Sequence, residues 1–319
     1  MKEFIIKSND AGQRLDRFTL KAAPLLAPSL AQKYIRLKRI KLNGRGAKRD
    51  ARLSEGDSVR MYINDEFFAG TRGGGEYLSI IDPGLAIVYE DSNILLADKR
   101  AGMLCHPGDG VDGADTLIAR VQAHLYLGGQ WRPGDEASFT PALCNRIDRN
   151  TSGLVIAAKN ADALRIVNEK IRAREIDKYY LAAVHGAPEP PSGRLEGYIF
   201  KDTAKNRVFV TASRTPGARE AVTEYRVVAG SGGLSLLECR LITGRTHQIR
   251  AQLAHIGCPL LGDGKYGRGD LDAPYGRRRQ ALCSHRVLFR FPTDAGALNY
   301  LRGREFTATS ADFVKEYFS

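Results

Sequence analysis

Residues 142–158 limit the possible folds of this chain more than any other stretch, because a charged and polar segment runs directly into a short apolar run there. Residues 154–158 are apolar and follow Gly153, which predicts a buried strand, and residues 150–153 predict the turn that leads into it. Asp148 lies just before this turn, flanked by Arg146 and Arg149. The pattern therefore predicts a carboxylate among cations at the mouth of a buried strand. The alternative is an ordinary turn residue that bonds its own backbone.

The pattern of apolar residues along the remainder predicts an α+β protein. Strands are predicted at residues 86–90, 94–98, 178–180, 223–228 and 234–241. Helices are predicted at residues 116–127, 161–174 and 247–255. Residues 187–220 are rich in Pro, Gly, Arg and Lys and predict an irregular excursion. Strands mostly follow strands here, so we expect a mixed, mainly antiparallel sheet flanked by helices and loops.

The chain divides by composition into three segments. Residues 1–64 predict a small module of two helices followed by strands, residues 65–80 a Gly-rich linker, and residues 81–319 a larger domain. Within the module, Ser29 is expected to cap the second helix, and Asn43-Gly44 predicts a tight turn between strands.

The positive charge of the chain is concentrated in the small module. The formal net charge is +12, and residues 1–64 carry 15 Lys and Arg against 6 Asp and Glu. A one-sided cluster of this kind suggests contacts with phosphate groups, although a basic surface kept for solubility is the alternative. The candidate residues for these phosphate contacts are Lys33, Arg36, Lys38, Arg39, Lys41 and Arg45.

Composition also excludes several classes of protein. No stretch approaches the ~20 apolar residues that a membrane span needs, and the first ten residues lack the features of a secretory or organellar signal. We therefore expect a cytoplasmic protein. The five cysteines are widely spaced and form no Cys-x-x-Cys pair, which argues against disulfides and a zinc knuckle. His247 and His255 lack a third ligand, so no metal site is predicted.

Three segments resemble the motifs of the RluA-type pseudouridine synthases. Residues 145–154 are similar to the family's His-Arg-Leu-Asp-x-x-Thr-Ser-Gly motif, residues 178–182 to its Lys-x-Tyr-x-Ala segment, and residues 243–263 to its third motif. The three occur in the family's order and span most of residues 85–292. Residues 13–18 and 35–44 resemble the RNA-binding domain named for ribosomal protein S-four, which often precedes this catalytic domain.

The chain departs from the family's motifs at four places. Asn145 stands for His, Ile147 for Leu, Arg100 where Pro is frequent, and Cys283-Ser284 where His-Ala is frequent. None of these changes touches the candidate catalytic Asp, Tyr or Arg, so they affect the subgroup more than the chemistry.

The resemblance implies an RNA pseudouridine synthase that acts on large-subunit ribosomal RNA without a cofactor, a metal or an obligate protein partner. It implies that Asp148 is the essential carboxylate, that Arg250 pairs with it, and that Tyr180 packs on the uracil ring. It also places Arg146 against the RNA. Each residue has a simpler interpretation, such as cross-strand packing for Tyr180 or a surface charge for Arg250. A non-catalytic RNA-binding or ribosome-assembly protein is the alternative function.

Overall fold

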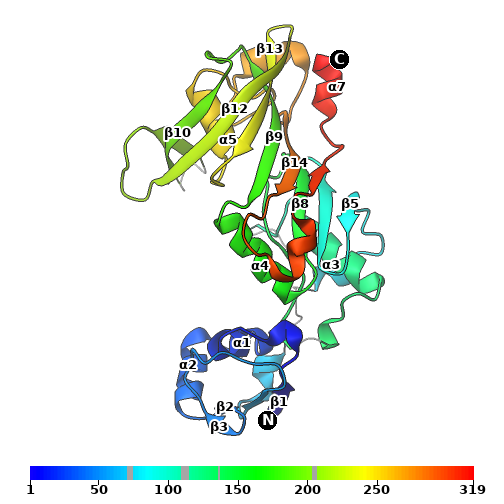
Figure 1. The fold of residues 1–319 in the computed structure, drawn as a ribbon, viewed down its shortest axis with the longest axis vertical. Helices are drawn as coiled ribbons and strands as arrows, with labels where there is room; N and C mark the ends of the chain where they lie inside the picture. Colours follow the sequence, from blue (N-terminus) through cyan, green and yellow to red (C-terminus); the bar gives the residue numbers. More distant parts are fainter. Residues whose placement is uncertain (70–74, 109–114, 136, 203–206) are drawn as a thin grey trace.

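The computed structural model describes residues 1–69, 75–108, 115–135, 137–202 and 207–319. Figure 1 shows an elongated molecule, with the N-terminal strands and helices at one end of its longest axis and helix α7 at the other. Most of the Gly-rich stretch predicted as a linker, residues 70–74, lies outside the described residues. Among the residues that are described, no helix is long and apolar enough to cross a membrane.

The N-terminal region contains two helices and a small sheet, as the sequence predicts. The strands lie in the order β1-β4-β2-β3. The elements are β1 (Lys2–Ile5), α1 (Leu15–Ala22), α2 (Pro28–Arg36), β2 (Ile40–Leu42), β3 (Arg45–Gly46) and β4 (Ser58–Met61). Phe18 and Ile35 from the helices are buried against Ile40 and Val59 of the sheet.

Two local predictions for this region have different outcomes. Asn43 and Gly44 both have positive φ, 50° and 75°, so the tight turn is confirmed. Ser29 does not cap α2, because the helix already begins at Pro28, whose fixed φ suits the first helical position. The boundary between residues 64 and 65 stays a prediction.

The rest of the chain is built on one mixed sheet, which within the described residues has 11 strands. Its main order is β11-β10-β12-β13-β9-β14-β8-β6-β5, and of the strand pairs among the described residues only β14–β8 is parallel. The mainly antiparallel prediction is confirmed. The strands are β5 (Ile87–Glu90), β6 (Ile94–Lys99), β7 (Ala142–Leu143), β8 (Ser152–Ala158), β9 (Ile176–His185), β10 (Ser192–Asp202), β11 (Arg207–Thr211), β12 (Arg219–Ser231), β13 (Leu234–Leu241), β14 (Leu282–Phe289) and β15 (Glu305–Thr307).

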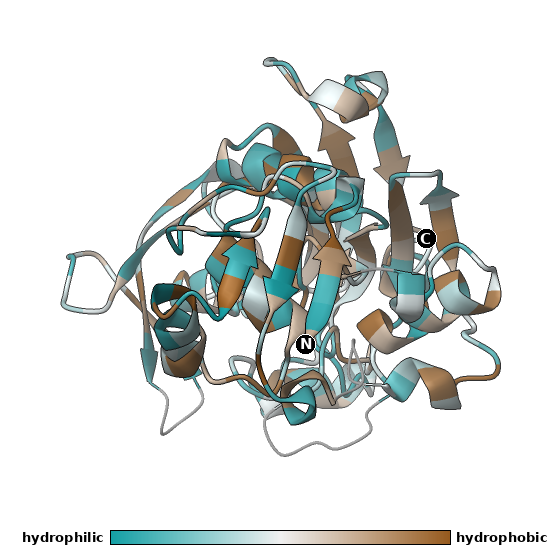
Figure 2. Cartoon of the chain, turned by 90° about the horizontal axis from the view of Figure 1, so that it is seen from below, coloured by the Kyte–Doolittle hydropathy of each residue, from teal (hydrophilic) through white to brown (hydrophobic). Residues whose placement is uncertain are grey.

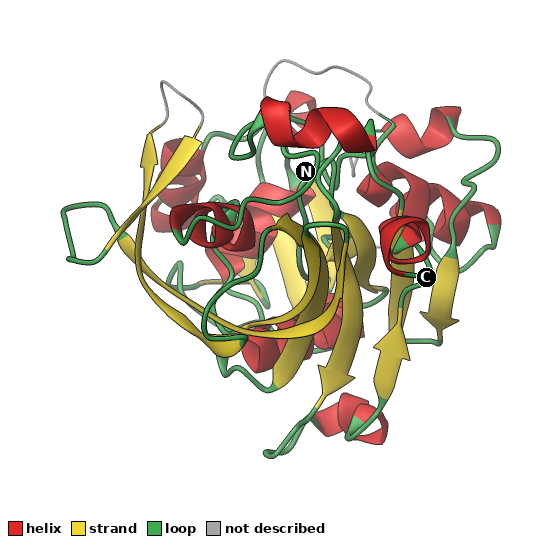
Figure 3. Ribbon diagram, turned by 90° about the horizontal axis from the view of Figure 1, so that it is seen from above, coloured by secondary structure: helices red, strands yellow, loops and turns green. Residues whose placement is uncertain are grey.

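Helices lie around this sheet (Figure 3), and two of them begin at residues whose side chains cap the helix. The Thr116 hydroxyl accepts a hydrogen bond from the Ala119 amide, and the Asn160 side chain accepts one from Ala163. The helices are α3 (Leu117–Leu127), α4 (Ala161–Arg172), α5 (Gln248–His255), α6 (Gly269–Asp272) and α7 (Asp312–Phe318).

Strand β8 lies in the core of the sheet, as its continuous apolar run predicts. Val155 and Ala157 pack into the core cluster on one face, while Leu154 and Ile156 pack into the cluster on the other. Because successive strand side chains point to opposite faces, a strand covered on both sides needs apolar residues at every position. In Figure 2, some strands of the protein are drawn mainly in brown, the colour of hydrophobic residues.

The prediction of an irregular excursion at residues 187–220 is wrong. Most of this segment forms strands β10 and β11 and the start of β12, paired in antiparallel register. In β10, exposed residues alternate with less exposed ones over its first half, which is the period of a half-covered strand. Its Gly, Arg and Lys content hid this alternation, and the pairing with the distant β12 stabilises the strand.

Gly153 allows strands β8 and β14 to approach closely. Its φ is +107°, and a Cβ atom at this position would lie 2.2 Å from the carbonyl oxygen of Ser284 on β14. Strand β8 already begins at Ser152, so Ser152 and Gly153 belong to the strand and not to the turn that the sequence predicted at residues 150–153. Gly153 thus fixes how the segment before it, which carries Asp148, enters the sheet.

We predict that Gly153→Ala lowers the free energy of unfolding by roughly 3 kcal/mol or more, because it adds both backbone strain and a clash with a neighbouring strand. Gly230→Ala on β12 is the matched control, since a Cβ there would meet its nearest atom at an ordinary 3.8 Å. Urea unfolding of both variants tests this. Equal stability of the two variants would contradict the close approach.

Candidate active site

The segment that carries Asp148 is held by a buried lysine. The Lys99 ammonium donates to the backbone oxygens of Met103 (2.8 Å), Arg149 (3.0 Å) and Arg100 (3.1 Å), and Lys99 is 1% exposed. The Thr151 amide bonds the Asp148 carbonyl at 3.1 Å and closes the turn. Burial lowers the pKa of Lys99 to about 8, against the opposing charges of Cys105 and Asp148. Lys99 thereby links the residues that directly follow β6 to the turn that carries Asp148.

Asp148 forms the ion pair that the motif resemblance implies. Arg250 on α5 donates from Nη1 to Asp148 Oδ2 at 2.8 Å, and its side chain is 8% exposed. Arg250 is therefore not a surface charge. The Asp148 side chain keeps 26% of its surface accessible, so one face of the carboxylate remains open to a ligand.

A second carboxylate, Asp263, holds the other side of the same guanidinium. Arg250 Nε and Nη2 donate to the two Asp263 oxygens at 2.7 and 2.8 Å. Asp263 also accepts the backbone amides of Lys265 and Tyr266. Burial would raise the pKa of Asp263, but the hydrogen bonds and charge of Arg250 outweigh burial and lower it. Arg250 is thus fixed by a fully buried bidentate pair and presents its remaining Nη1 group to Asp148.

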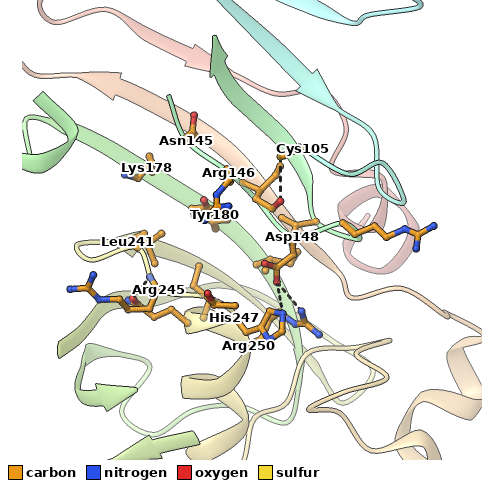
Figure 4. Close-up of a pocket in the computed structure, with 18 of the residues that line it drawn as sticks. Cys105, Asn145, Arg146, Asp148, Lys178, Tyr180, Leu241, Arg245, His247 and Arg250 are labelled. Carbon is orange, nitrogen blue, oxygen red and sulfur yellow. Dashed lines mark hydrogen bonds and ion pairs between the residues drawn. The ribbon is translucent and has the colours of Figure 1, made fainter. Parts of the chain in front are cut away.

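His247 is the N-cap residue of α5 and, like Arg250, approaches the Oδ2 atom of Asp148 (Figure 4). Its Nε2 is 3.9 Å from Asp148 Oδ2, and its Nδ1 is 2.9 Å from the Tyr266 hydroxyl. Tyr266 accepts the Val208 amide, which leaves its O–H free to donate to Nδ1. When the Tyr266 hydroxyl donates to Nδ1, the proton of a neutral imidazole lies on Nε2, which faces Asp148. Burial lowers the pKa of His247, although Asp148 opposes this shift.

Tyr180 on β9 faces the same space from the sheet. It is 5% exposed, and burial raises its pKa, against a smaller opposing contribution from Ser284. At neutral pH its phenol is therefore a hydrogen-bond donor with a flat apolar ring, suited to packing against a base.

Asp148, Tyr180, Arg250 and Arg146 line one pocket of about 610 Å³ (Figure 4). This volume lies within the range for pockets that enclose a small ligand. Arg146 is exposed at the pocket and lies two residues before Asp148. The structure therefore brings together all four candidate residues outside the basic module. Their catalytic and binding roles remain predictions.

Asn145 occupies the position where the resembled family has His. Its side-chain oxygen accepts the Ile156 amide of β8 at 2.8 Å. Its Nδ2 is buried without a hydrogen-bond partner among the described residues, and Asn145 lines the pocket. The asparagine therefore braces the Asp148 segment against β8.

The six basic residues proposed from residues 33–45 lie apart from this pocket, on the N-terminal region. Five of them are exposed and Lys41 is partly exposed. Among the residues that the structure describes, no carboxylate forms an ion pair with any of the six. They are Lys33, Arg36, Lys38, Arg39, Lys41 and Arg45.

Sequence reasoning missed three residues that shape the site: Lys99, His247 and Asp263. His247 and Asp263 stood inside the segment 243–263 that matched the family, yet neither received a role at the site, because burial and the partner of a side chain cannot be read from the sequence. Among the described residues, the structure contains no group of three or more His, Cys, Asp or Glu that could hold a metal ion.

Comparisons with known proteins agree with this geometry. Residues 93–255 match the family model for RNA pseudouridylate synthase. An uncharacterized RNA pseudouridine synthase of Chlorobaculum parvum is 32% identical over 90% of this chain and 89% of its own length. The ribosomal large subunit pseudouridine synthase D of Xanthomonas campestris is 30% identical over 94% of this chain and 85% of its own length.

A solved structure, human RNA Pseudouridylate Synthase Domain Containing 1, has a similar fold. It matches with a TM-score of 0.54 and 20% identity, and the match covers 73% of this chain and 94% of that one. At this identity, the likeness concerns the fold alone.

We predict that Asp263→Asn lowers the free energy of unfolding by about 3 to 5 kcal/mol at pH 7, because it breaks a buried ion pair. The lowered pKa of Asp263 means that the wild type holds this contribution above the unfolded pKa of about 3.9 and loses it as the pH falls through the folded pKa. The stability gap between wild type and variant should therefore narrow in acid. Denaturant melts from pH 7 to pH 3 measure it.

Asp270→Asn is the control, because Asp270 also pairs with an arginine, Arg268, but both side chains are exposed. Its stability should stay near that of the wild type. A gap for Asp263→Asn that stays constant in acid would show that the carboxylate is not stabilised by Arg250.

Proposed function

The chain belongs to the RNA pseudouridylate synthase family, and from this premise we propose that it isomerises uridines in large-subunit ribosomal RNA, with Asp148 as the catalytic carboxylate and no external cofactor. The single observation that carries the proposal is the Asp148–Arg250 pair at 2.8 Å, partly open to a pocket of nucleoside size.

The reaction breaks the bond between N1 of uracil and C1′ of ribose, rotates the base and joins its C5 to C1′. The proton on C5 is lost and N1 gains one, so the nucleotide is neither oxidised nor reduced. A carboxylate beside the sugar can attack C1′, attack the base, or remove a sugar proton to give a glycal. All three routes use the negative charge of Asp148, and the Arg250 guanidinium beside it places a positive charge 2.8 Å away.

Arg250 also keeps the carboxylate in one orientation. Its guanidinium is already held by both Asp263 oxygens, so the contact with Asp148 needs little further ordering when RNA binds. Tyr180 offers a flat buried ring for the uracil, which retains the base while its glycosidic bond is broken.

A uridine inside folded RNA must leave its stack to reach this pocket, at a cost of a few kcal/mol. Arg146 is exposed at the pocket and could fill the gap by stacking on neighbouring bases. This role would make Arg146 a residue for substrate access, separate from the chemistry at Asp148.

Two observations favour ribosomal RNA of the large subunit as the substrate. Relatives from Xanthomonas campestris and Borreliella burgdorferi carry the name ribosomal large subunit pseudouridine synthase D. The N-terminal region presents basic side chains that have no ion-pair partners among the described residues, which suits phosphate contacts with a large folded RNA. We propose this region as an S-four-like RNA-binding module.

We predict that Asp148→Asn abolishes pseudouridine formation and leaves RNA affinity nearly unchanged, since the amide keeps the shape of the side chain but removes its charge. Pseudouridines should be mapped in large-subunit ribosomal RNA from cells that lack the protein, then after the wild type or the variant is restored. Sites that return only with the wild type identify the target uridines.

Asp162→Asn on α4 is the control carboxylate, because Asp162 pairs with Arg165 and does not line the pocket. It should restore every site. Full activity of Asp148→Asn would exclude the assignment, and an unchanged map without the protein would favour the non-catalytic alternative or another RNA.

We predict that neutralising Arg36 and Arg45 together, each to Gln, weakens RNA binding and makes its salt dependence shallower. The slope of log K against log salt should fall in magnitude by about 0.7 to 0.9 for each phosphate that the protein no longer neutralises. The slope is measured from the affinity for the mapped RNA segment at salt concentrations between about 50 and about 200 mM.

Arg302→Gln with Lys315→Gln is the matched control, because both residues are exposed and lie far along the chain from the N-terminal module. Its slope should equal that of the wild type. An unchanged slope in the Arg36 and Arg45 variant would show that the module does not contact phosphate through these residues.

A further inference from the structure

A second, smaller pocket of about 220 Å³ adjoins the active-site pocket. Ile171, Lys178 and Leu241 line both pockets, so the two share a rim where β9 begins and β13 ends. Figure 4 shows Lys178 and Leu241 together on the side of the active-site pocket away from Asp148. A polymer bound in the active-site pocket can therefore continue over this rim into the second pocket.

The second pocket is strongly basic. Five cations line it, against only two carboxylates, Asp177 and Glu224. Its volume lies below the range for pockets that enclose a whole small ligand. The cations are Arg174, Lys178, Arg194, Arg240 and Arg290.

The arginines of this pocket are pre-positioned by the sheet. Arg194, Glu224 and Arg240 are direct cross-strand neighbours on β10, β12 and β13. Arg240 donates to Glu224 at 3.1 Å and to Asp177 at 3.1 and 3.2 Å, and Arg290 contacts Asp177 at 2.9 Å. Arg194 also pairs with Glu196, so carboxylates on the sheet hold these three arginines in place.

Part of this charge remains available to a ligand. The side chains of Arg174, Arg194 and Arg290 are 55%, 49% and 42% exposed. The Nε of Arg240 is buried and has no hydrogen-bond partner within the described residues. A network that served stability alone would bury its groups with their partners satisfied.

We propose that this pocket binds backbone phosphates of the RNA strand next to the target uridine. The proposal rests on the proposed function, because the strand is defined as the one whose uridine occupies the active-site pocket. Arginine forks match the oxygens of a phosphodiester, and the small volume admits the backbone but not a second nucleoside. The rim at Lys178 then sets the path of the strand between the two pockets.

The test uses the full chain with Arg174→Gln and Arg290→Gln, and the RNA segment in which wild-type activity has been mapped. RNA affinity should fall, with a salt slope shallower by about 0.7 for each single-strand phosphate that is no longer neutralised. The loss should appear mainly in the RNA concentration that gives the half-maximal single-turnover rate, because neither side chain reaches the reacting atoms.

Neutral methylphosphonates placed singly on each side of the target uridine identify the phosphates involved. The wild type should lose affinity at one or two of these positions, and the double variant should lose nothing further there, which is the coupling expected for a direct contact. Additive losses at every position would overturn the proposal.

Arg226→Gln with Arg302→Gln is the matched control, because Arg226 lies on the same sheet, is 62% exposed and paired, and lines neither pocket. An equal loss in control and test variants would indicate diffuse charge and overturn the site. If the test variant does not fold, Arg194→Gln replaces it, since Arg194 is half exposed and pairs with Glu196 and Glu224.

These outcomes separate the two proposals. A wild type that forms no pseudouridine in any ribosomal RNA contradicts the proposed function. If the wild type is active but the arginine changes do not alter the affinity lost at each methylphosphonate, only the proposal for the second pocket is contradicted.

Discussion

The active site depends on how one arginine is shared between two carboxylates. Arg250 is almost fully buried, and burying an unpaired guanidinium would be costly, so Asp263 is needed before Arg250 can serve Asp148. Asp263 takes two of the guanidinium's groups and leaves one for the residue that faces the pocket. This division gives Asp148 a fixed partner while its own carboxylate stays partly accessible.

The backbone around Asp148 is constrained as tightly as its charge. The Lys99 ammonium donates to three backbone carbonyl groups, two in the segment after β6 and one in the Asp148 turn. Gly153 lets β8 lie against β14 at a point where a side chain would clash. Each constraint comes from a different part of the sheet. The carboxylate is therefore positioned by packing and hydrogen bonds that exist before any RNA arrives.

Cations are used in two ways in this protein. In the large sheet, arginines such as Arg240 and Arg286 pair with carboxylates on other strands of the same sheet. In the N-terminal region, the exposed cations around Arg36 and Arg45 face solvent without ion-pair partners among the described residues. Charges with partners hold their positions, whereas charges without partners keep their full attraction for phosphate, so the two groups suit different steps of RNA binding.

The sequence by itself determined the features that depend on near neighbours: the buried strand at β8, the strands β5 and β6, the Asn43-Gly44 turn and the presence of a polar turn before β8. Strand period and turn chemistry act over a few residues, so they can be read without the fold. The resemblance of the sequence to the family's motifs implied that Asp148 meets Arg250, 102 positions away, and the structure shows the contact. Only the tertiary structure decided that most of residues 187–220 form strands and that Asp263 is buried beneath the site. Those outcomes follow from long-range pairing and burial, which set the partner of a charged side chain and leave no local trace in the chain.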